Sequence, residues 1–283
     1  MAPAAFSREA MTPANPRWEK AISRERELYS QKGDARPPFW RDYNRILHCN
    51  AYRRLKHKTQ VFFATQNDHV CTRIEHVNHV AAVSESIATT LGLDSSLTRA
   101  IAIGHDVGHA PFGHHGEEIL STLACNDGAR EFWHEGNSLR FVDELETLED
   151  PNGHQRNLAL TYAVRDGIVC HCGEIDEESL RPRDEMLDLR AIAEPGSVPP
   201  YTWEGCVVKI ADKITFLGRD IEDARRLGLL TERNLHELRA ILKEGLGGQV
   251  VELYNTAILH TLISDLCQQS SPEAGLRLSL IHI

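Results

Sequence analysis

The sequence predicts an all-α protein with a single main domain. Three observations support this class: apolar residues recur at helical spacing along most of the chain, runs of alternating Val, Ile and Thr typical of strands are scarce, and repeats are absent. A length of 283 residues is enough to bury a sizeable core. The content of 41% hydrophobic and 25% charged residues is ordinary for a globular chain and excludes collagen-like and mostly disordered classes.

The two ends of the chain are predicted to differ from this domain. Residues 1–40 are rich in Pro, Arg, Glu and Ser, so we expect a mobile, loosely held arm with a short helix near 18–29. Regular structure is expected to begin near Phe39, and the domain to occupy residues 41–270. The tail at 271–283 does not have the pattern of a closing helix, which leaves open an incomplete C-terminus.

The first strong helical pattern has apolar-face residues that step by 4, 3, 4 and 4 along the chain, namely His76, Val80, Val83, Ile87 and Leu91. Gly92 predicts the end of this helix, and Asp94 or Ser95 predicts the cap of the next. This second helix is expected to run into residues 105–109, because Pro111 breaks it.

Later helical patterns predict six further segments, at 116–125, 136–148, 155–171, 203–226, 232–245 and 249–268. Residues 173–200 are polar and contain four prolines. We therefore expect a long surface loop there.

The charge balance and the cysteines limit the class of partner. A net charge of −10 is a poor match to a dedicated nucleic-acid binder, which normally has a basic excess. No stretch approaches the roughly 18 uninterrupted apolar residues of a spanning helix, and no segment resembles a signal peptide, so we expect a cytoplasmic protein without membrane contact. The seven scattered cysteines are expected to be reduced. Cys170-His171-Cys172 lacks the second ligand pair of a zinc finger or ribbon, which disfavours zinc there.

Histidine is the unusual residue, with 15 in all and nine between positions 57 and 134. His76 lies at the start of one predicted helix and His105-Asp106 at the end of the next, with 28 residues between them, so antiparallel packing would bring these ends together. A buried, unpaired Asp costs several kcal/mol, and a divalent cation would remove that cost. Mixed imidazole and carboxylate ligands suit Mn, Fe, Co, Ni, Zn or Mg. The alternative is an ordinary histidine at a helix N-terminus and a capping Asp106.

Five segments of the chain occur in an order typical of one family. They are RRLKHKTQVF (53–62), TRIEHVNHV (72–80), IGHDVGHAPFGHHGEE (103–118), FWHEGNSLRFV (132–142) and ADKITFLGRDIEDA (211–224). Together they resemble the HD-domain deoxynucleoside triphosphate triphosphohydrolases, the dGTPase-like dNTPases, over about residues 40–270. The resemblance implies a helical HD fold, a divalent cation such as Mn²⁺, Mg²⁺ or Co²⁺, and hydrolysis of a dNTP to a deoxynucleoside and inorganic triphosphate.

The resemblance also implies roles for individual residues. The implied metal ligands are His76, His105, Asp106 and Asp212. The implied catalytic residues are the pair His114 and Glu117, with His109 and His134 as further pocket histidines. The i, i+3 spacing of the pair places both on one face of a helix, where the carboxylate can orient the imidazole. A solvated loop histidine is the alternative for His134.

Four more residues are implied to bind substrate, namely Arg73, Gln60, Lys213 and Asp220. Arg73 resembles the arginine that reaches the α-phosphate, and Gln60 the glutamine that reads the sugar 3′-hydroxyl. Lys213 and Asp220 match polar residues that line the nucleotide site. The alternative is a solvated surface charge for Arg73, Lys213 and Asp220, and an ordinary polar turn residue for Gln60.

The chain departs from the family pattern in three respects. Phe216 stands where many relatives have Tyr, which removes one hydroxyl from the implied pocket. The segment HEGNS at 134–138 replaces the commoner HNEQS, and the chain is short for the family. Substrate affinity or base preference can differ as a result. His79 and His115 lack a family counterpart and are expected to have no role in the site.

The expected chemistry is attack of an activated water on the α-phosphorus, with His114 passing a proton to the leaving 5′-oxygen. Two alternatives stay open. One is an HD phosphohydrolase acting on another nucleotide. The other is a nucleotide-binding regulatory module with weak turnover, or a single-stranded nucleic-acid binder that uses the basic residues 53–58 and 225–226. The resemblance also leaves open a homo-oligomer.

Overall fold

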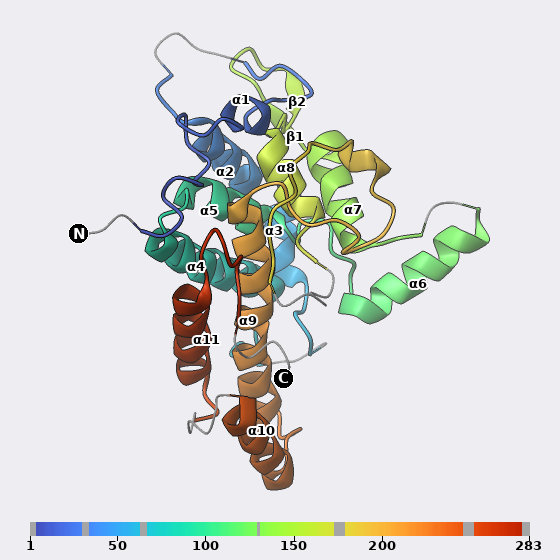
Figure 1. Ribbon diagram of the computed structural model, residues 1–283. Helices are drawn as coiled ribbons and strands as arrows, with labels where there is room; N and C mark the ends of the chain where they lie inside the picture. Colours follow the sequence, from blue (N-terminus) through green and yellow to red (C-terminus); the bar gives the residue numbers. More distant parts are fainter. Residues whose placement is uncertain are drawn as a thin grey trace.

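The computed structural model describes residues 4–29, 34–62, 67–128, 131–172, 179–245 and 252–278. Helices dominate this part of the chain, which confirms the predicted all-α class (Figure 1). The α-helices are α1 (Trp18–Ala21), α2 (Pro38–His48), α3 (Asn50–Arg54), α4 (Arg73–Leu91), α5 (Ser95–Gly104), α6 (Gly113–Asn126), α7 (His134–Arg140), α8 (Tyr162–Val169), α9 (Trp203–Arg226), α10 (Glu232–Gly245) and α11 (Asn255–Gln269). The other elements are the 3-10 helices η1 (Leu55–His57) and η3 (Leu189–Ala191), the π-helix η2 (Phe141–Leu145) and the strands β1 (Thr147–Glu149) and β2 (Gln155–Asn157).

Helices α4 and α5 form the antiparallel pair on which the site is built. Thr72 and Glu75 form a capping box at the start of α4, which ends at Gly92 with a φ of 83°, a conformation that costs glycine little. Asp94 then caps α5 by accepting a hydrogen bond from the backbone N–H of Leu97 at 2.8 Å. Both ends agree with the sequence prediction. The short turn lays α5 against α4 and returns the end of α5 to the start of α4.

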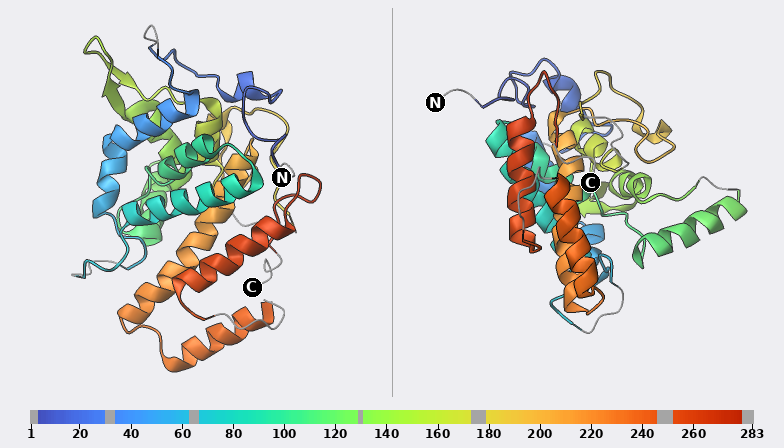
Figure 2. Two further views of the ribbon diagram at one scale, coloured as in Figure 1. Left: turned by 90° about the vertical axis from the view of Figure 1, so that its left-hand side faces the viewer. Right: turned by 60° about the horizontal axis from the view of Figure 1, so that its bottom comes forward.

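The 24-residue helix α9, drawn in orange, is the longest of the described helices and extends from the body of the molecule toward α10 (Figure 1 and Figure 2). It begins after Thr202, whose hydroxyl accepts a hydrogen bond from the backbone N–H of Gly205 at 3.0 Å. It packs against α4, α5, α8 and α11. Because residues 203–211 are all buried, the first half of α9 is fixed in the core and holds Asp212 beside α4 and α5.

The N-terminal segment belongs to the core. Two hydrophobic clusters fill the molecule, and the segment contributes Met11 to the cluster around α2, α5 and α8 and Phe6 to the cluster around α9 and α11. Phe6 is fully buried and lies edge-on to Trp203, with ring centroids 4.9 Å apart. The expectation of a loosely held arm is therefore corrected for residues 4–29. The apolar side chains there are irregularly spaced, so helical periodicity does not register them.

A β-hairpin replaces the beginning of the helix predicted at 155–171. Strand β2 pairs antiparallel with β1, and α8 starts only at Tyr162. The connecting turn is held by Asp150, whose Oδ1 accepts a hydrogen bond from the backbone N–H of His154 at 3.0 Å, and Gly153 has a φ of 82°. The turn residues Asp-Pro-Asn-Gly are typical of a hairpin, and this local signal outweighs the weak helical periodicity around it.

The remaining differences concern helix ends. The helix expected at 136–148 consists of α7 and the wider η2, and the helix expected near 18–29 is the four-residue α1. The helix expected at 249–268 is α11 and begins at Asn255, with 246–251 outside the described residues. The predicted loop at 173–200 contains only η3 as regular structure from residue 179 onward, and 173–178 lie outside the described residues.

The described part of the C-terminal tail packs against the domain. Leu276 is fully buried, and its backbone exchanges two 2.9 Å hydrogen bonds with Leu180. Residues 279–283 of the predicted tail lie outside the described residues. Among the described helices, none combines the length and the apolar character that crossing a bilayer requires.

Candidate functional site

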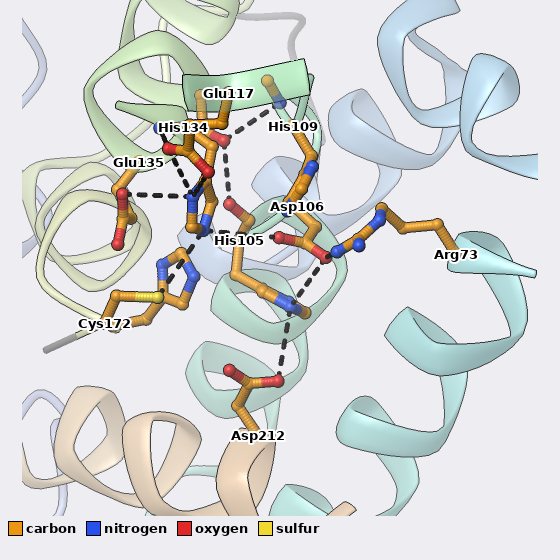
Figure 3. Close-up of polar contacts among 12 residues, drawn as sticks. Arg73, His105, Asp106, His109, Glu117, His134, Glu135, Cys172 and Asp212 are labelled. Carbon is orange, nitrogen blue, oxygen red and sulfur yellow. Dashed lines mark hydrogen bonds and ion pairs between the residues drawn. The ribbon is translucent and has the colours of Figure 1, made fainter. Parts of the chain in front are cut away.

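The centre of the site is a cluster of three side chains from three parts of the chain. His76 comes from the first turn of α4, His105 directly follows α5, and Asp212 lies midway along α9. Figure 3 shows His105 and Asp212. Nε2 of His76 lies 2.9 Å from Oδ1 of Asp212, and Nε2 of His105 lies 3.8 Å from the same oxygen. The ligand atoms of all three lie within 4.8 Å of one another, so one cation can reach them together.

A backbone contact of His105 leaves one of its ring nitrogens able to bind a metal ion. Its Nδ1 lies 2.6 Å from the carbonyl oxygen of Ala102 and donates a proton to it, which leaves a lone pair on Nε2. This Nε2 is buried and has no hydrogen-bond partner among the residues that the structure describes. An unpaired buried nitrogen costs about 1–3 kcal/mol, and a bound cation would remove that cost. The residues present therefore fit a divalent metal ion.

Asp106 pairs with Arg73 and adjoins this trio on the His105 side. Its Oδ2 accepts a hydrogen bond from Nη1 of Arg73 at 2.5 Å and lies 3.6 Å from Nε2 of His105. Burial alone would raise the pKa of Asp106, but the Arg73 guanidinium and the nearby imidazoles hold it well below its usual range. The structure thus gathers three of the four predicted metal ligands around one point and places the fourth, ionised, directly beside His105.

Ser138 helps to fix the turn after α5 that contains His105 and Asp106. Oγ of Ser138, in α7, accepts a hydrogen bond from the backbone N–H of Gly108 at 2.9 Å and donates one to the carbonyl oxygen of His105 at 2.8 Å. A Cβ on Gly108 would lie 2.2 Å from the backbone nitrogen of Ser138, so only glycine allows this approach. The backbone on both sides of Asp106 is therefore anchored to α7.

The four predicted catalytic residues lie together beside Asp106. Figure 3 shows His109, Glu117 and His134 on the side of Asp106 away from Asp212. Glu117, in the first turn of α6, accepts a hydrogen bond from the backbone N–H of His134 at 2.7 Å and lies 3.0 Å from its Nδ1. Nδ1 of His114 lies farther from Glu117, at 3.4 Å, and the His114 side chain is 84% exposed. The His109 ring lies 4.5 Å from that of His134 and 5.5 Å from that of His114, measured between centroids. Glu117 therefore binds His134 more closely than its predicted partner His114.

The two buried imidazoles of this group differ in charge. Burial lowers the pKa of His109 to about 3, so its ring is neutral at neutral pH. Burial would also lower the pKa of His134, but the hydrogen bond to Glu117 and the charges of Glu135 and Asp106 raise it to about 9. A protonated ring and a neutral ring therefore lie side by side, and the difference between their pKa values keeps the proton on His134.

The predicted substrate-binding residues flank the cluster on two sides. Nη2 of Arg73 donates a hydrogen bond to the backbone oxygen of Gln60 at 2.9 Å, and the buried side-chain Oε1 of Gln60 has no partner in the described part of the chain. Lys213 and Asp220 are half-buried on α9, next to Asp212 and two turns beyond it. Burial raises the pKa of Asp220 to about 6.

Sequence reasoning missed three residues of the site. Lys58 donates a hydrogen bond to the carbonyl oxygen of His109, and burial lowers the pKa of Lys58 to about 8. His171 is buried with its ring centroid 4.8 Å from that of His105, and Glu135 lies 3.4 Å from Nδ1 of His134. The basic run at 53–58 and the Cys-His-Cys triplet hinted at the first two, whereas nothing in the sequence distinguishes Glu135.

The comparison with protein families decides the assignment. Residues 73–217, about half of the chain, match the family described as HD domain. The chain belongs to the HD domain family. The matched segment of this HD domain contains His76, His105 and Asp212, the three residues of the central cluster.

Individual relatives give a more specific resemblance than the family match does. A protein of Caldanaerobacter subterraneus subsp. tengcongensis named "Deoxyguanosinetriphosphate triphosphohydrolase-like protein" is 39% identical over 241 residues, which are 85% of this chain and 61% of that protein. Proteins of the same name from Desulfatibacillum aliphaticivorans and Geobacter metallireducens are 39% and 40% identical and are covered over 60% and 51% of their lengths. These matches confirm the resemblance to dGTPase-like proteins. The HD-domain chain spans about three fifths or less of the relatives' own lengths.

Proposed function

We propose that this HD-domain protein hydrolyses deoxynucleoside triphosphates at the α-phosphorus and releases a deoxynucleoside and inorganic triphosphate. The observation that carries the proposal is the histidine–aspartate cluster, formed by the buried His76 and His105 and the half-buried Asp212, with an unpaired imidazole nitrogen on His105. A group of acid–base residues adjoins that cluster. The family match and the names of the relatives support a metal-dependent phosphohydrolase.

In this proposal His76, His105 and Asp212 hold a divalent cation together with Asp106. When bound, the cation supplies charge stabilisation at the α-phosphate and acidifies a water. Arg73 is already in place beside Asp106, and its guanidinium can also offset phosphate charge. Lys213 adds a compact charge from α9.

The proton that the leaving 5′-oxygen needs comes from His114, at the start of α6. His114 is exposed and can reach a bound nucleotide, and Glu117 lies close enough to orient its ring. His134 stays protonated beside Glu117 and keeps positive charge next to the phosphates. The unpartnered Oε1 of Gln60 can accept a hydrogen bond from the sugar 3′-hydroxyl.

The decisive experiment incubates the metal-stripped protein with each dNTP and Mn²⁺, Mg²⁺ or Co²⁺, and separates the products by chromatography. The proposal expects a deoxynucleoside and intact triphosphate, and only when a cation is added. Orthophosphate as the sole inorganic product would favour an HD phosphohydrolase of another specificity. Nucleotide binding without turnover would favour a regulatory module.

Substitutions then test the assigned roles. His105→Ala and Asp106→Ala should abolish turnover while the helical circular dichroism signal stays, and full activity in either would overturn the metal assignment. His114→Ala should lower kcat roughly 100- to 10,000-fold, the usual contribution of a general acid. His115→Ala is the matched control, because this neighbouring side chain is 79% exposed and pairs only with Glu118 among the described residues.

A further inference from the structure

We propose that His134, Glu135, His171 and Cys172 form a second cation site, suited to a thiophilic divalent cation such as Zn²⁺. The site lies beside the histidine–aspartate cluster, between the first turn of α7 and the residues that follow α8 (Figure 3). One ligand atom from each of the four residues lies within 4.8 Å of the others. Three of the four side chains are buried and the fourth is half-buried, so water competes little for the ion.

The spacing of the donors is close to that of a tetrahedral zinc site. In such sites neighbouring ligand atoms are roughly 3.3–3.8 Å apart, given the usual Zn–N and Zn–S bond lengths. Sγ of Cys172 lies 3.5 Å from Nε2 of His134, inside that range. The widest separations allowed by the 4.8 Å limit need to close by about 1 Å, which side-chain rotation can supply.

Both imidazoles are held as metal-binding imidazoles normally are, with the other ring nitrogen bonded elsewhere. Nδ1 of His134 lies 3.0 Å from Oε1 of Glu117, and Nδ1 of His171 lies 2.7 Å from the carbonyl oxygen of Ile168. In each ring Nε2 is left as the ligand atom. Nε2 of His171 is buried and lacks a hydrogen-bond partner among the described residues, and this unsatisfied atom points to a ligand.

The sulfur distinguishes this site from the neighbouring cluster. His171 also lies near His105 and Asp106, but the donors there are only nitrogen and oxygen, which suit Mn²⁺ or Mg²⁺. A Cys thiolate with two imidazoles and a carboxylate suits Zn²⁺. Two anionic ligands balance the double charge of the ion, so a buried site of this composition is neutral. Binding displaces the thiol proton of Cys172 and the proton on His134, and both pass to the solvent, so an ion at this site and the protonated His134 of the proposed hydrolysis exclude each other.

The chain also fixes the position of Cys172 from outside the cluster. Nζ of Lys209, on the buried half of α9, donates a hydrogen bond to the Cys172 carbonyl oxygen. This contact ties the residue to the same helix that carries Asp212. The cysteine is therefore positioned before any ion binds.

Titration of the metal-free full-length chain with Co²⁺ tests the proposal, because thiolate ligation gives a near-ultraviolet charge-transfer band that nitrogen and oxygen ligands do not. We expect this band in the wild type, its displacement by Zn²⁺, and its loss in Cys172→Ser together with one equivalent of bound Zn²⁺. Cys170→Ser is the matched control, since the Cys170 sulfur faces Asp166 outside the cluster and its loss should leave the band. No band in the wild type, or a band that survives in Cys172→Ser, would overturn the proposal.

Two further variants separate the two sites and guard against misfolding. Glu135→Gln, nearly isosteric, should weaken Zn²⁺ binding at least about 10-fold while the helical signal is kept. His76→Ala removes a ligand of the first cluster only, so the cobalt–thiolate band should persist in it. Unchanged Zn²⁺ affinity in Glu135→Gln, or loss of the band in His76→Ala, would overturn the second site. None of these readouts depends on nucleotide hydrolysis.

Discussion

At the scale of single residues, the site contains a buried ion pair, Arg73 and Asp106, in which the two charges offset each other. Arg73 and Asp106 are each about 4% exposed and share a 2.5 Å hydrogen bond. Such a pair adds little net stability over an apolar pair, because both charges lose their hydration, but removing one partner leaves an expensive unpaired charge. The pair therefore keeps an ionised carboxylate next to His105 in the absence of a cation.

This balance predicts a large effect of Arg73→Met on the metal-free protein. The substitution should lower the free energy of unfolding by about 3–5 kcal/mol, because Asp106 loses its counter-charge. The double variant Arg73→Met/Asp106→Asn should recover much of that loss, since the buried charge is gone. Urea unfolding with a chelator present measures both.

The exposed ion pair Arg233–Glu237 provides the control, with side chains 87% and 52% exposed. Arg233→Met should change the free energy of unfolding by less than about 1 kcal/mol. Additive effects in the double variant at the site would show that the two charges do not interact.

At the scale of elements, the site depends on where α7 meets the turn after α5. Ser138 makes two of the hydrogen bonds that hold this turn, to Gly108 and to His105, and Nδ2 of Asn137 donates a third to the Gly108 carbonyl oxygen at 2.6 Å. Neither α5 nor α7 alone fixes the conformation of this turn. The proposed metal ligands His105 and Asp106 are therefore positioned by a polar contact between elements that are separated by α6 in the chain.

We expect Ser138→Ala to lower the free energy of unfolding by about 1–3 kcal/mol, because it leaves a buried N–H and a buried carbonyl unpaired. It should also weaken Mn²⁺ binding, since the backbone around Asp106 is released. Calorimetric titration with Mn²⁺ and chemical unfolding measure the two effects. Ser121→Ala, on the half-exposed part of α6, should change neither, and an equally mild Ser138→Ala would argue against this role.

Elements fixed by local chemistry could be predicted from the sequence, and those fixed by distant contacts could not. Gly92 and Asp94 define the turn between α4 and α5 within a few residues, so the meeting of His76 and His105 follows from the pattern. His171 reaches the site only because α8 packs against α5 and α7. The protonation of His134 depends on burial and on Glu117, 17 positions away, and no pattern along the chain encodes it.

At the scale of the whole molecule, one buried carboxylate joins three segments. Oε1 of Glu204, near the start of α9, accepts hydrogen bonds from the backbone N–H groups of Met11 at 2.8 Å and Asp94 at 3.0 Å. It thereby ties the N-terminal segment and the α4–α5 turn to the central helix. Burial raises the pKa of Glu204 from 4.5 to about 7.

This shift predicts a pH-dependent stability. Between pH 4.5 and pH 7 the folded protein keeps the Glu204 proton that the unfolded chain has lost, so Glu204 makes the free energy of unfolding fall as pH rises. The fall attributable to Glu204 is at most about 3 kcal/mol. Glu204→Gln should remove that part of the slope in urea unfolding across this range.

Glu19→Gln serves as the control, because this α1 side chain is exposed. It should leave the slope as in the wild type. The same slope in Glu204→Gln and wild type would mean that the buried carboxyl does not titrate in this range.

Helix α6 projects from the body of the molecule (Figures 1 and 2). Of its fourteen residues, all of which the structure describes, only Gly116 is buried, so apolar packing contributes little to its attachment. The beginning of α6 is attached to α7 through Glu117, whose carboxylate contacts the backbone N–H and Nδ1 of His134. The helix that carries two of the proposed catalytic residues is thus the most weakly attached part of the site. On warming, we expect it to detach first, so that heat inactivates the protein at temperatures where the hydrophobic body is still folded.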